Sequence, residues 1–245
     1  MRVPRRFPRS VSVTVVAGTA ALLAGLTISQ IGVWKDSVSL WRHCLAHEQR
    51  EAMPYYNLAC ALEDAHDKAS AEAAYRHALA IEPLNADALM NYAALLIEQR
   101  RFAEALPAAR KAFAVAPKDA LASFTLGRAL TAMGDHAAAI TAYAETVRID
   151  PNHVPARNNL ATALARAGRH DAAISEFQAV LAIAPESLAT RRNLALSLEE
   201  AGRTAEAIAA WRTVLARQPD DRQVAVRIEI LEARQTAASD GRKER

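Results

Sequence analysis

The stretch "VPARNNLATALARAGRHDAAISEFQAVLAIAPES", residues 154–187, decides the fold, because its pattern recurs along most of the chain. Its last proline belongs to a series spaced 34 residues apart: Pro83, Pro117, Pro151, Pro185 and Pro219. Identical intervals between unrelated prolines are very improbable, so the series indicates an internal repeat. With each proline at position 32, the repeats cover residues 52–85, 86–119, 120–153, 154–187 and 188–219.

Other positions of the repeat carry the same kind of residue each time. Position 8 is always small: Ala59, Ala93, Gly127, Ala161 and Ala195. Position 11 is always leucine: Leu62, Leu96, Leu130, Leu164 and Leu198. Position 20 is always alanine: Ala71, Ala105, Ala139, Ala173 and Ala207. Position 24 is aromatic in four repeats: Tyr75, Tyr143, Phe177 and Trp211. Each repeat is therefore predicted to be two antiparallel helices, close at the small positions, with proline ending the second helix.

This pattern resembles the tetratricopeptide repeat family over residues 52–219. The resemblance implies an all-α fold, a superhelix or α-solenoid in which each helix pair buries its apolar face against its neighbours. Gly134, Gly168 and Gly202 occupy the predicted turn between the two helices, where a left-handed backbone is cheap for glycine. We expect this solenoid to be preceded by one N-terminal transmembrane helix.

The second repeat is irregular. Arg100 and Arg101 stand where other repeats have the turn glycine, and Ala109 takes the aromatic position. Pro107 lies within the predicted second helix, where it should remove one hydrogen bond and bend the helix. Both a hinge and a neutral replacement fit this pattern.

The segment after Pro219 predicts a capping helix over residues 220–235. Val224, Ile228 and Leu231 fall at helical spacing with charged residues between them, which is typical of a helix with one exposed face. Residues 236–245 are polar and charged, and we expect a disordered tail there.

The first 34 residues predict a membrane anchor. Residues 1–9 form a basic segment with four arginines and no acid, and residues 10–34 carry no charge. As a helix, the uncharged stretch would be roughly 37 Å long, enough to cross an apolar core of about 30 Å. A cleaved signal peptide ending near Ala20 is the alternative. The basic cluster predicts a single-pass protein of the inner (cytoplasmic) membrane, with its N-terminus in the cytoplasm and its repeats in the periplasm.

Residues 30–49, "QIGVWKDSVSLWRHCLAHEQ", form the junction between the apolar stretch and the repeats. In the 34-residue frame extended backwards, Ser37 falls on the small position 20 and Trp41 on the aromatic position 24. Residues 35–51 therefore predict a juxtamembrane half-repeat helix. Residues 26–219 resemble the last membrane helix and repeat region of O-mannosyltransferase-like membrane proteins, without their catalytic membrane domain.

The first helices of the repeats are expected to line a concave groove. Position 6 is asparagine in four of the five repeats, at Asn57, Asn91, Asn159 and Asn193, and Thr125 takes the remaining place. This resembles the asparagine ladder of O-linked N-acetylglucosamine transferases, in which a carboxamide can pair with an extended peptide backbone. Hydrogen bonding to the neighbouring repeat is the alternative. Tyr56, Phe124 and Arg128 are further candidate peptide-binding residues, and Arg166 also lies on this face.

Charge and motifs exclude several classes of function. The formal net charge is +3, but residues 52–219 hold seventeen Lys and Arg against eighteen Asp and Glu, so no basic stripe for nucleic acid is predicted on the repeats. His43 and His47 share a helix face without a completing ligand set. No catalytic, cofactor or metal residue is predicted. Cys44 falls at a packing position and is expected to be a buried small residue, with a disulfide to Cys60 as the alternative.

The sequence therefore predicts a membrane-anchored scaffold that binds an extended peptide of a protein partner outside the cytoplasm. Two alternatives stay open. The chain could be the repeat module of a membrane glycosyltransferase system, with a polytopic membrane protein as its partner, or a cleaved periplasmic assembly factor. On none of these readings is the chain an enzyme by itself.

Overall fold

The computed structural model describes the backbone of residues 35–243 and the side chains of residues 35–237. Residues 35–88 and 89–243 form two compact parts. The expected basic segment at residues 1–9 and the expected membrane helix at residues 10–34 lie outside the described residues. No helix within residues 35–243 combines the length and apolarity that a bilayer crossing requires.

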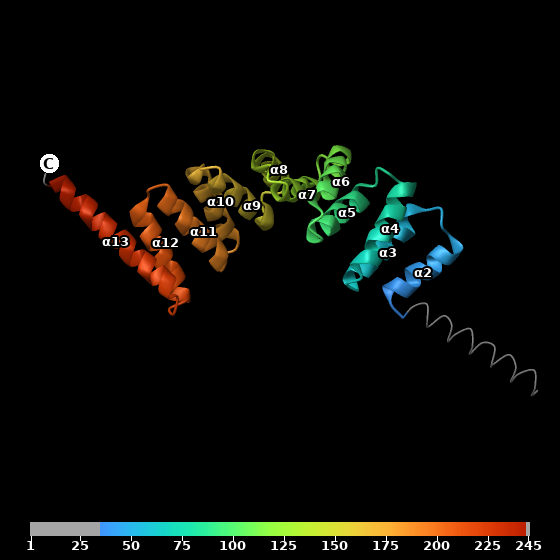
Figure 1. Ribbon diagram of the computed structural model, residues 1–245, viewed down its shortest axis with the longest axis horizontal. Coiled ribbons are helices and arrows are strands. Elements are labelled where there is room, and N and C mark those ends of the chain that lie inside the picture. Colours follow the sequence, from blue (N-terminus) through green and yellow to red (C-terminus); the bar gives the residue numbers. More distant parts are fainter. Residues whose placement is uncertain (1–34, 244–245) are drawn as a thin grey trace, which may run out of the picture. The chain divides into compact units, whose positions relative to one another are not determined.

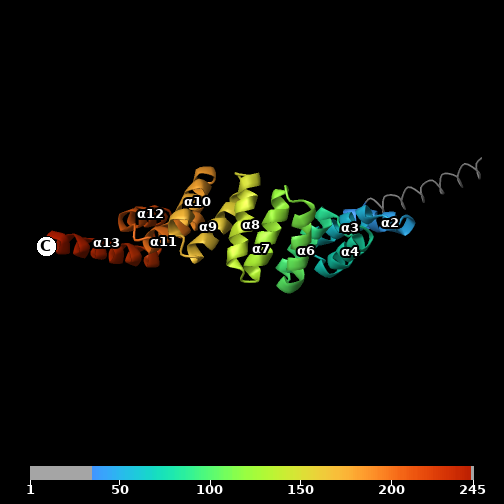
Figure 2. The ribbon, with the colours of Figure 1, turned by 90° about the horizontal axis from the view of Figure 1, so that it is seen from above.

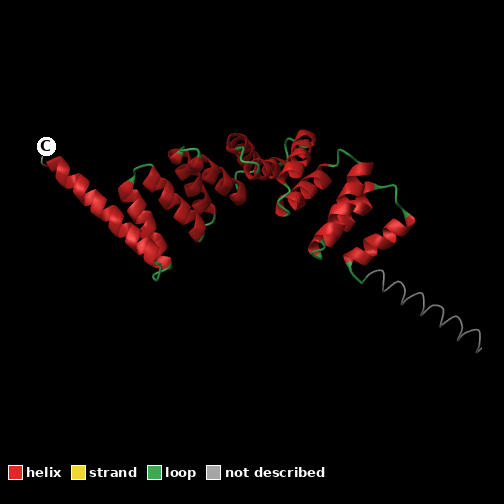
Figure 3. Cartoon of the chain, in the orientation of Figure 1, coloured by secondary structure: helices red, strands yellow, loops and turns green. Residues whose placement is uncertain are grey.

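Every regular element of the described chain is an α-helix (Figure 3). The first part contains α2 (Ser37–His47), α3 (Ala52–Asp64) and α4 (Lys68–Ile81). The boundary between the parts falls within α5 (Ala86–Glu98). The second part continues with α6 (Phe102–Val115), α7 (Ala120–Ala132), α8 (His136–Ile149), α9 (Val154–Arg166), α10 (His170–Ile183), α11 (Leu188–Glu200), α12 (Thr204–Arg217) and α13 (Arg222–Lys243) (Figure 1).

The helices keep the 34-residue period of the sequence. The first helices of the five repeats, α3, α5, α7, α9 and α11, each have 13 residues and begin at equivalent positions. The second helices, α4, α6, α8, α10 and α12, each have 14 residues. The prediction of an all-α solenoid of helix pairs is thereby confirmed for the residues that the structure describes.

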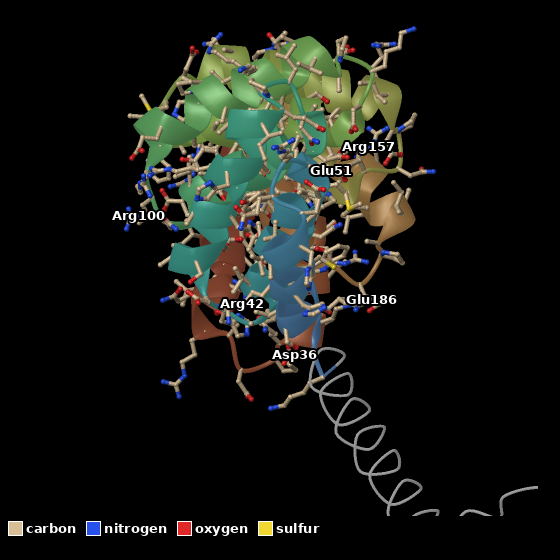
Figure 4. All side chains as sticks on the ribbon, turned by 90° about the vertical axis from the view of Figure 1, so that its right-hand side faces the viewer. Asp36, Arg42, Glu51, Arg100, Arg157 and Glu186 are labelled. Atoms are coloured by element: carbon tan, nitrogen blue, oxygen red, sulfur yellow. The ribbon has the colours of Figure 1, made fainter. Side chains whose placement is uncertain are left out.

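In the first part, α4 packs along α3, and α2 packs against α3. Tyr75 on α4 is fully buried, and Leu58 and Leu62 on α3 are also buried. Asp36 caps α2 by accepting a hydrogen bond from the backbone N–H of Ser39 at 2.7 Å, while Ser39 Oγ lies 3.3 Å from the Asp36 backbone nitrogen. Figure 4 shows Asp36 at the start of α2 and Arg42 further along it. This capping box holds the start of the first described helix.

In the second part, α7 and α8 lie side by side, as do α9 and α10 (Figure 2). The core between them takes one large residue from each helix: Leu126, Tyr143, Leu160 and Phe177 are all buried. Position 8 is glycine in this repeat and alanine in the others, because the Tyr143 ring leaves no room for a Cβ at Gly127. A Cβ added at Gly127 would lie 2.5 Å from the Tyr143 ring.

The turn inside each repeat has the same left-handed backbone. Gly134, Gly168 and Gly202 have φ values of 82°, 73° and 72°, as their positions predict, and His66 and Arg100 adopt φ values of 61° at the equivalent positions of the first two repeats. Pro107 lies within α6, which nevertheless continues as one helix to Val115. The second repeat thus keeps the helix–turn–helix geometry despite its irregular sequence.

The C-terminal helix α13 closes the second part. Val224, Ile228 and Leu231 are buried in a cluster with Ile208 and Trp211. The helix runs to Lys243, so the structure differs from the expected capping helix at residues 220–235 and disordered tail at residues 236–245. Its composition explains the difference, because residues 232–239 contain neither glycine nor proline and so do not stop a helix once it is nucleated.

Candidate functional site

The expected peptide-binding residues of the first part lie on α3. Asn57 is half-buried, and its side-chain amide lies 2.9 Å from Met53 Sδ on the preceding turn. Tyr56 is half-buried, with its ring centroid 6.3 Å from that of Tyr75. Both side chains therefore retain exposed surface on the first helix of their repeat.

A polar cluster lies behind these two residues. Burial raises the pKa of the Tyr75 hydroxyl, and its hydrogen bond to Glu63 and the nearby Cys60 thiol act in the same direction. The Cys60 sulfur lies 3.5 Å from this hydroxyl. Tyr75 therefore stays protonated and donates to the Glu63 carboxylate, which gives a half-buried acid a partner.

The expected residues of the second part are all half-buried on first helices: Asn91 on α5, Phe124 and Arg128 on α7, Asn159 on α9 and Asn193 on α11. Thr125, which replaces asparagine on α7, is buried. Each of these residues therefore keeps some exposed surface.

The contacts of Asn159 are relevant to the alternative, in which these amides hydrogen-bond the neighbouring repeat. Its side chain hydrogen-bonds the hydroxyl of Tyr143, which lies on α8 in the preceding repeat. The adjacent Asn158 makes a similar link forward, accepting a hydrogen bond from Thr190 on α11 at 3.0 Å. Asn159 thus has a structural contact between repeats as well as exposed surface.

Arg128 and Asn159 come together at a hollow of about 340 Å³. The residues that line this hollow, here called the arginine hollow, are Ile97, Arg128, Thr131, Ala132, His136, Tyr143, Asn159, Thr162, Ala163 and Arg166. Its volume is in the range of about 300–1,000 Å³ that is usual for ligand pockets. All but Ile97, His136 and Tyr143 come from the first helices α7 and α9.

Phe124 packs against two residues that line the hollow, Tyr143 and Arg128. Its ring centroid lies 4.8 Å from that of His153 and 6.0 Å from that of Tyr143. The Arg128 guanidinium carbon lies 5.9 Å from the Phe124 centroid, within the distance of a cation–π contact. Phe124 and Arg128, two of the predicted residues, are therefore in contact with each other.

Tyr143 contributes a polar hydroxyl group to the lining of the arginine hollow. Burial raises the pKa of its hydroxyl, whereas its hydrogen bonds with Thr131 and Asn159 and the positive charge of Arg128 act in the opposite direction. The Thr131 and Tyr143 hydroxyl oxygens are 3.1 Å apart. Tyr143 therefore stays protonated. Its hydroxyl group lies in a hydrogen-bond network close enough to Arg128 to be affected by the guanidinium charge.

Several lining residues were not among the predicted binding residues. Arg166 lies at position 13 of its repeat and Arg128 at position 9 of the preceding one, a register that could have signalled their convergence on adjacent first helices. Tyr143 and Thr131 carried no such signal, because Tyr143 occupies the core position 24. Its ring occupies the space beside position 8 of the same repeat, where Gly127 has no Cβ.

A second, larger hollow of about 1050 Å³ lies in the same part of the chain. It is lined by residues of the second helices α6, α8 and α10, including Phe113, Ile140 and Ser175, above buried leucines of α7 and α9. It contains none of the predicted binding residues. No sequence pattern had marked this face.

The described residues hold no group of three or more His, Cys, Asp or Glu side chains placed to bind a metal ion. The His43 and His47 rings lie edge to face with centroids 4.8 Å apart on α2. Cys44 and Cys60 are free thiols. The geometry of the arginine hollow suits hydrogen bonding and charge pairing with a ligand.

The sequence was compared with known families and proteins. A family model described as tetratricopeptide repeat matches residues 56–120, 95–154 and 124–187, and a second model of the same description matches residues 164–226. These matches begin after the junction at residues 30–49. No curated protein matches the chain.

Solved structures resemble this fold at low sequence identity. The crystal structure of YrrB, described as a TPR protein with an unusual peptide-binding site, has a TM-score of 0.69 at 22% identity, covering 77% of this chain and 97% of that one. A tetratricopeptide repeat protein from Parabacteroides merdae has a TM-score of 0.65 at 18% identity, covering 79% and 77%. MamA from Desulfovibrio magneticus has a TM-score of 0.58 at 24% identity, covering 66% and 93%. These similarities concern the fold.

Proposed function

The chain belongs to the tetratricopeptide repeat family, and we propose that it is a non-catalytic scaffold that binds an extended segment of a partner protein along its first helices. The arginine hollow is the observation that carries this proposal. It joins two repeats of the second part and gathers guanidinium, carboxamide and hydroxyl groups on the helices that the sequence assigned to binding.

The chemistry of the lining suits an extended peptide. Such a peptide exposes backbone N–H and C=O groups that must find partners when it leaves water. Asn159 and Thr162 can each donate and accept, and Arg128 and Arg166 can donate to carbonyl oxygens. YrrB, which has a related fold, is described as having a peptide-binding site, and this supports the same class of ligand here.

The test is binding of the full chain to an array of short peptides. Asn91, Asn159 and Asn193 would be changed together to alanine, and Asn57 separately, because it lies in the other part of the chain. Each lost amide hydrogen bond should cost about 0.5–1.5 kcal/mol. We expect the triple variant to lose most of its bound peptides.

The control for these variants is Asn152→Ala, which changes an exposed amide in the turn before α9. Circular dichroism would verify that each variant is folded, because Asn159 also contacts Tyr143. Unchanged peptide capture by the folded triple variant would remove the asparagines from the proposal. Absence of any bound peptide for the wild-type chain would overturn the proposed function.

We also propose that residues 10–34 anchor the chain in the inner membrane with its repeats outside the cytoplasm. The uncharged stretch and the preceding arginines support this. The tagged chain would be expressed in a Gram-negative host, and its membranes washed with alkaline carbonate. We expect the chain to stay in the membrane and its repeats to be degraded by protease added to spheroplasts. Release by the wash, or full protection from protease, would contradict the proposal.

The junction resemblance supports a finer proposal, that the scaffold serves a membrane glycosyltransferase system. The resemblance covers residues 26–219, and its specific part is the words WKDS at 34–37 and LWRH at 40–43. Cross-linking in native membranes, followed by mass spectrometry, would identify the partner. Recovery of a polytopic glycosyltransferase is the expected result, and recovery of soluble partners alone would favour the periplasmic assembly factor.

A further inference from the structure

Two arginines line the arginine hollow without an ion pair of their own. Arg128 reaches it from α7 and Arg166 from α9. Within the described part of the chain, neither guanidinium forms a salt bridge. Arg157, also on α9, provides the contrast, because it pairs with Glu176 at 2.5 Å. Of the two arginines on α9, Arg157 thus forms an ion pair within the chain, whereas Arg166 lines the hollow.

The two helices that carry these arginines contain no carboxylate. Neither α7, "ALASFTLGRALTA", nor α9, "VPARNNLATALAR", contains an acidic residue. None of the ten residues that line the hollow is Asp or Glu. The potential inside the hollow is therefore positive, although the repeats as a whole carry balanced charge.

The position of Arg128 is fixed by packing. Its guanidinium lies over the Phe124 ring, which is itself held between His153 and Tyr143. A guanidinium held in place loses less side-chain entropy when it binds a ligand, so it binds more strongly than a free one. The Tyr143 hydroxyl and the Asn159 amide lie beside it and can complete the coordination of an anion.

We propose that the arginine hollow binds the side-chain carboxylate of an Asp or Glu residue within the extended peptide. This inference rests on the proposed function and names the residue class that the groove selects. Arginine–carboxylate hydrogen bonds are charge-assisted and are about twice as strong as neutral ones. The hollow therefore supplies specificity, whereas the asparagines supply contacts that are independent of sequence.

The location of the hollow favours an internal residue of the peptide over its C-terminus. Ile97, near the end of α5, lines one side, and α11 packs against α10 on the other. First helices of the same part thus continue on both sides of α7 and α9. A peptide that follows them passes the hollow with chain on either side.

The experiment is binding of the full chain to paired peptide arrays. One array holds short peptides with blocked N- and C-termini, and each Asp or Glu peptide has a partner with Asn or Gln. A second array holds the same Asn and Gln peptides with free C-termini. The variants are Arg128→Gln and Arg166→Gln, alone and together. Arg234→Gln, on an exposed residue of α13, is the charge-matched control.

We expect the wild-type chain and the Arg234 control to bind blocked acidic peptides about tenfold more tightly than their amide partners. The double variant should lose this preference and still bind the amide partners with unchanged affinity. The preference should also weaken as salt is raised, because the arginines are accessible to water.

Two results would overturn the inference while leaving the proposed function intact. The first is peptide binding with no preference for acids, or with a preference that the double variant retains. The second is a carboxylate effect confined to peptides with free C-termini, which would assign the hollow to chain ends. If the wild-type chain binds no peptide at all, the inference falls together with the proposed function.

Discussion

The residue that makes the turn inside each repeat has a positive φ in all five repeats, but only three of these residues are glycine. At Arg100 the backbone reproduces the bonding of the glycine turns: Arg101 N–H donates to the Leu96 carbonyl at 2.9 Å, as Arg169 N–H does to Leu164. A left-handed conformation costs a residue with a Cβ roughly 1–2 kcal/mol. Arg100, labelled in Figure 4, is exposed, and no ion pair with another residue of the described chain offsets this cost.

Arg100→Gly should therefore stabilise the chain. We expect the free energy of unfolding to rise by about 0.5–1 kcal/mol, since relief of the backbone strain exceeds the entropy that glycine adds to the unfolded state. Urea denaturation followed by circular dichroism would measure the change. Ala103→Gly, in the helical backbone of α6, is the control and should destabilise. A loss of stability in Arg100→Gly would refute this account of the turn.

Gly127 is required by the size of its neighbour. A Cβ at this position would lie 2.5 Å and 2.6 Å from Tyr143 ring carbons, so the ring or α7 would have to move. We expect Gly127→Ala to lower the free energy of unfolding by about 1–3 kcal/mol. Adding Tyr143→Leu should restore part of this loss. The measurement is chemical denaturation of both variants, and full stability of the alanine variant would contradict the prediction.

At the scale of elements, α13 is joined to the last repeat by an apolar face and by ion pairs. Arg192 on α11 pairs with Asp221 at the start of α13, and Arg227 on α13 lies 2.7 Å from Glu199. The hydrogen bond from Arg192 holds the pKa of Asp221 below its ordinary value of 3.8, and a backbone hydrogen bond from Val224 acts in the same direction. The start of α13 is thus tied to α11 by a carboxylate that must be ionised.

This arrangement predicts that acid weakens the attachment of α13 to α11. Because the folded pKa of Asp221 is depressed, its stabilisation is complete above the unfolded value of about 3.9 and is lost as pH falls through the folded pKa. Asp221→Asn should lose the stabilisation at neutral pH and show a smaller further loss in acid. The difference between wild type and variant in thermal unfolding, followed from neutral to acid pH, measures it. Asp220→Asn is the control, and equal pH profiles for Asp221→Asn and wild type would contradict the prediction.

The elements also show how far sequence patterns reach. The prolines and alanines of the period predicted all ten repeat helices, because the period reports directly which face of each helix is buried. The left-handed turns at His66 and Arg100 could not be predicted from the pattern, because glycine has the lowest conformational cost there but other residues can adopt the same backbone. The length of α13 could not be predicted from the sequence pattern either, because helix propagation past residue 235 depends on a nucleus that tertiary packing provides.

At the scale of the whole molecule, the repeat pattern predicted part of the arginine hollow. Arg128 and Asn159 both line it, and Phe124 contacts Arg128. The contributions of Tyr143 and Thr131 were not predicted, because the pattern assigns position 24 to the core and does not show where its hydroxyl lies. The larger hollow on α6, α8 and α10 was equally hidden, since it arises from the spacing of second helices.

The two hollows offer competing sites, and the central claim is that partners bind the one on the first helices. Site-specific photo-crosslinking tests it most directly. Benzoylphenylalanine would replace Thr162, which lines the arginine hollow, or Ser175, which lines the larger one, and each chain would be irradiated with a peptide recovered from the array. Our account predicts a crosslink from position 162 and none from position 175. A crosslink from position 175 alone would contradict it.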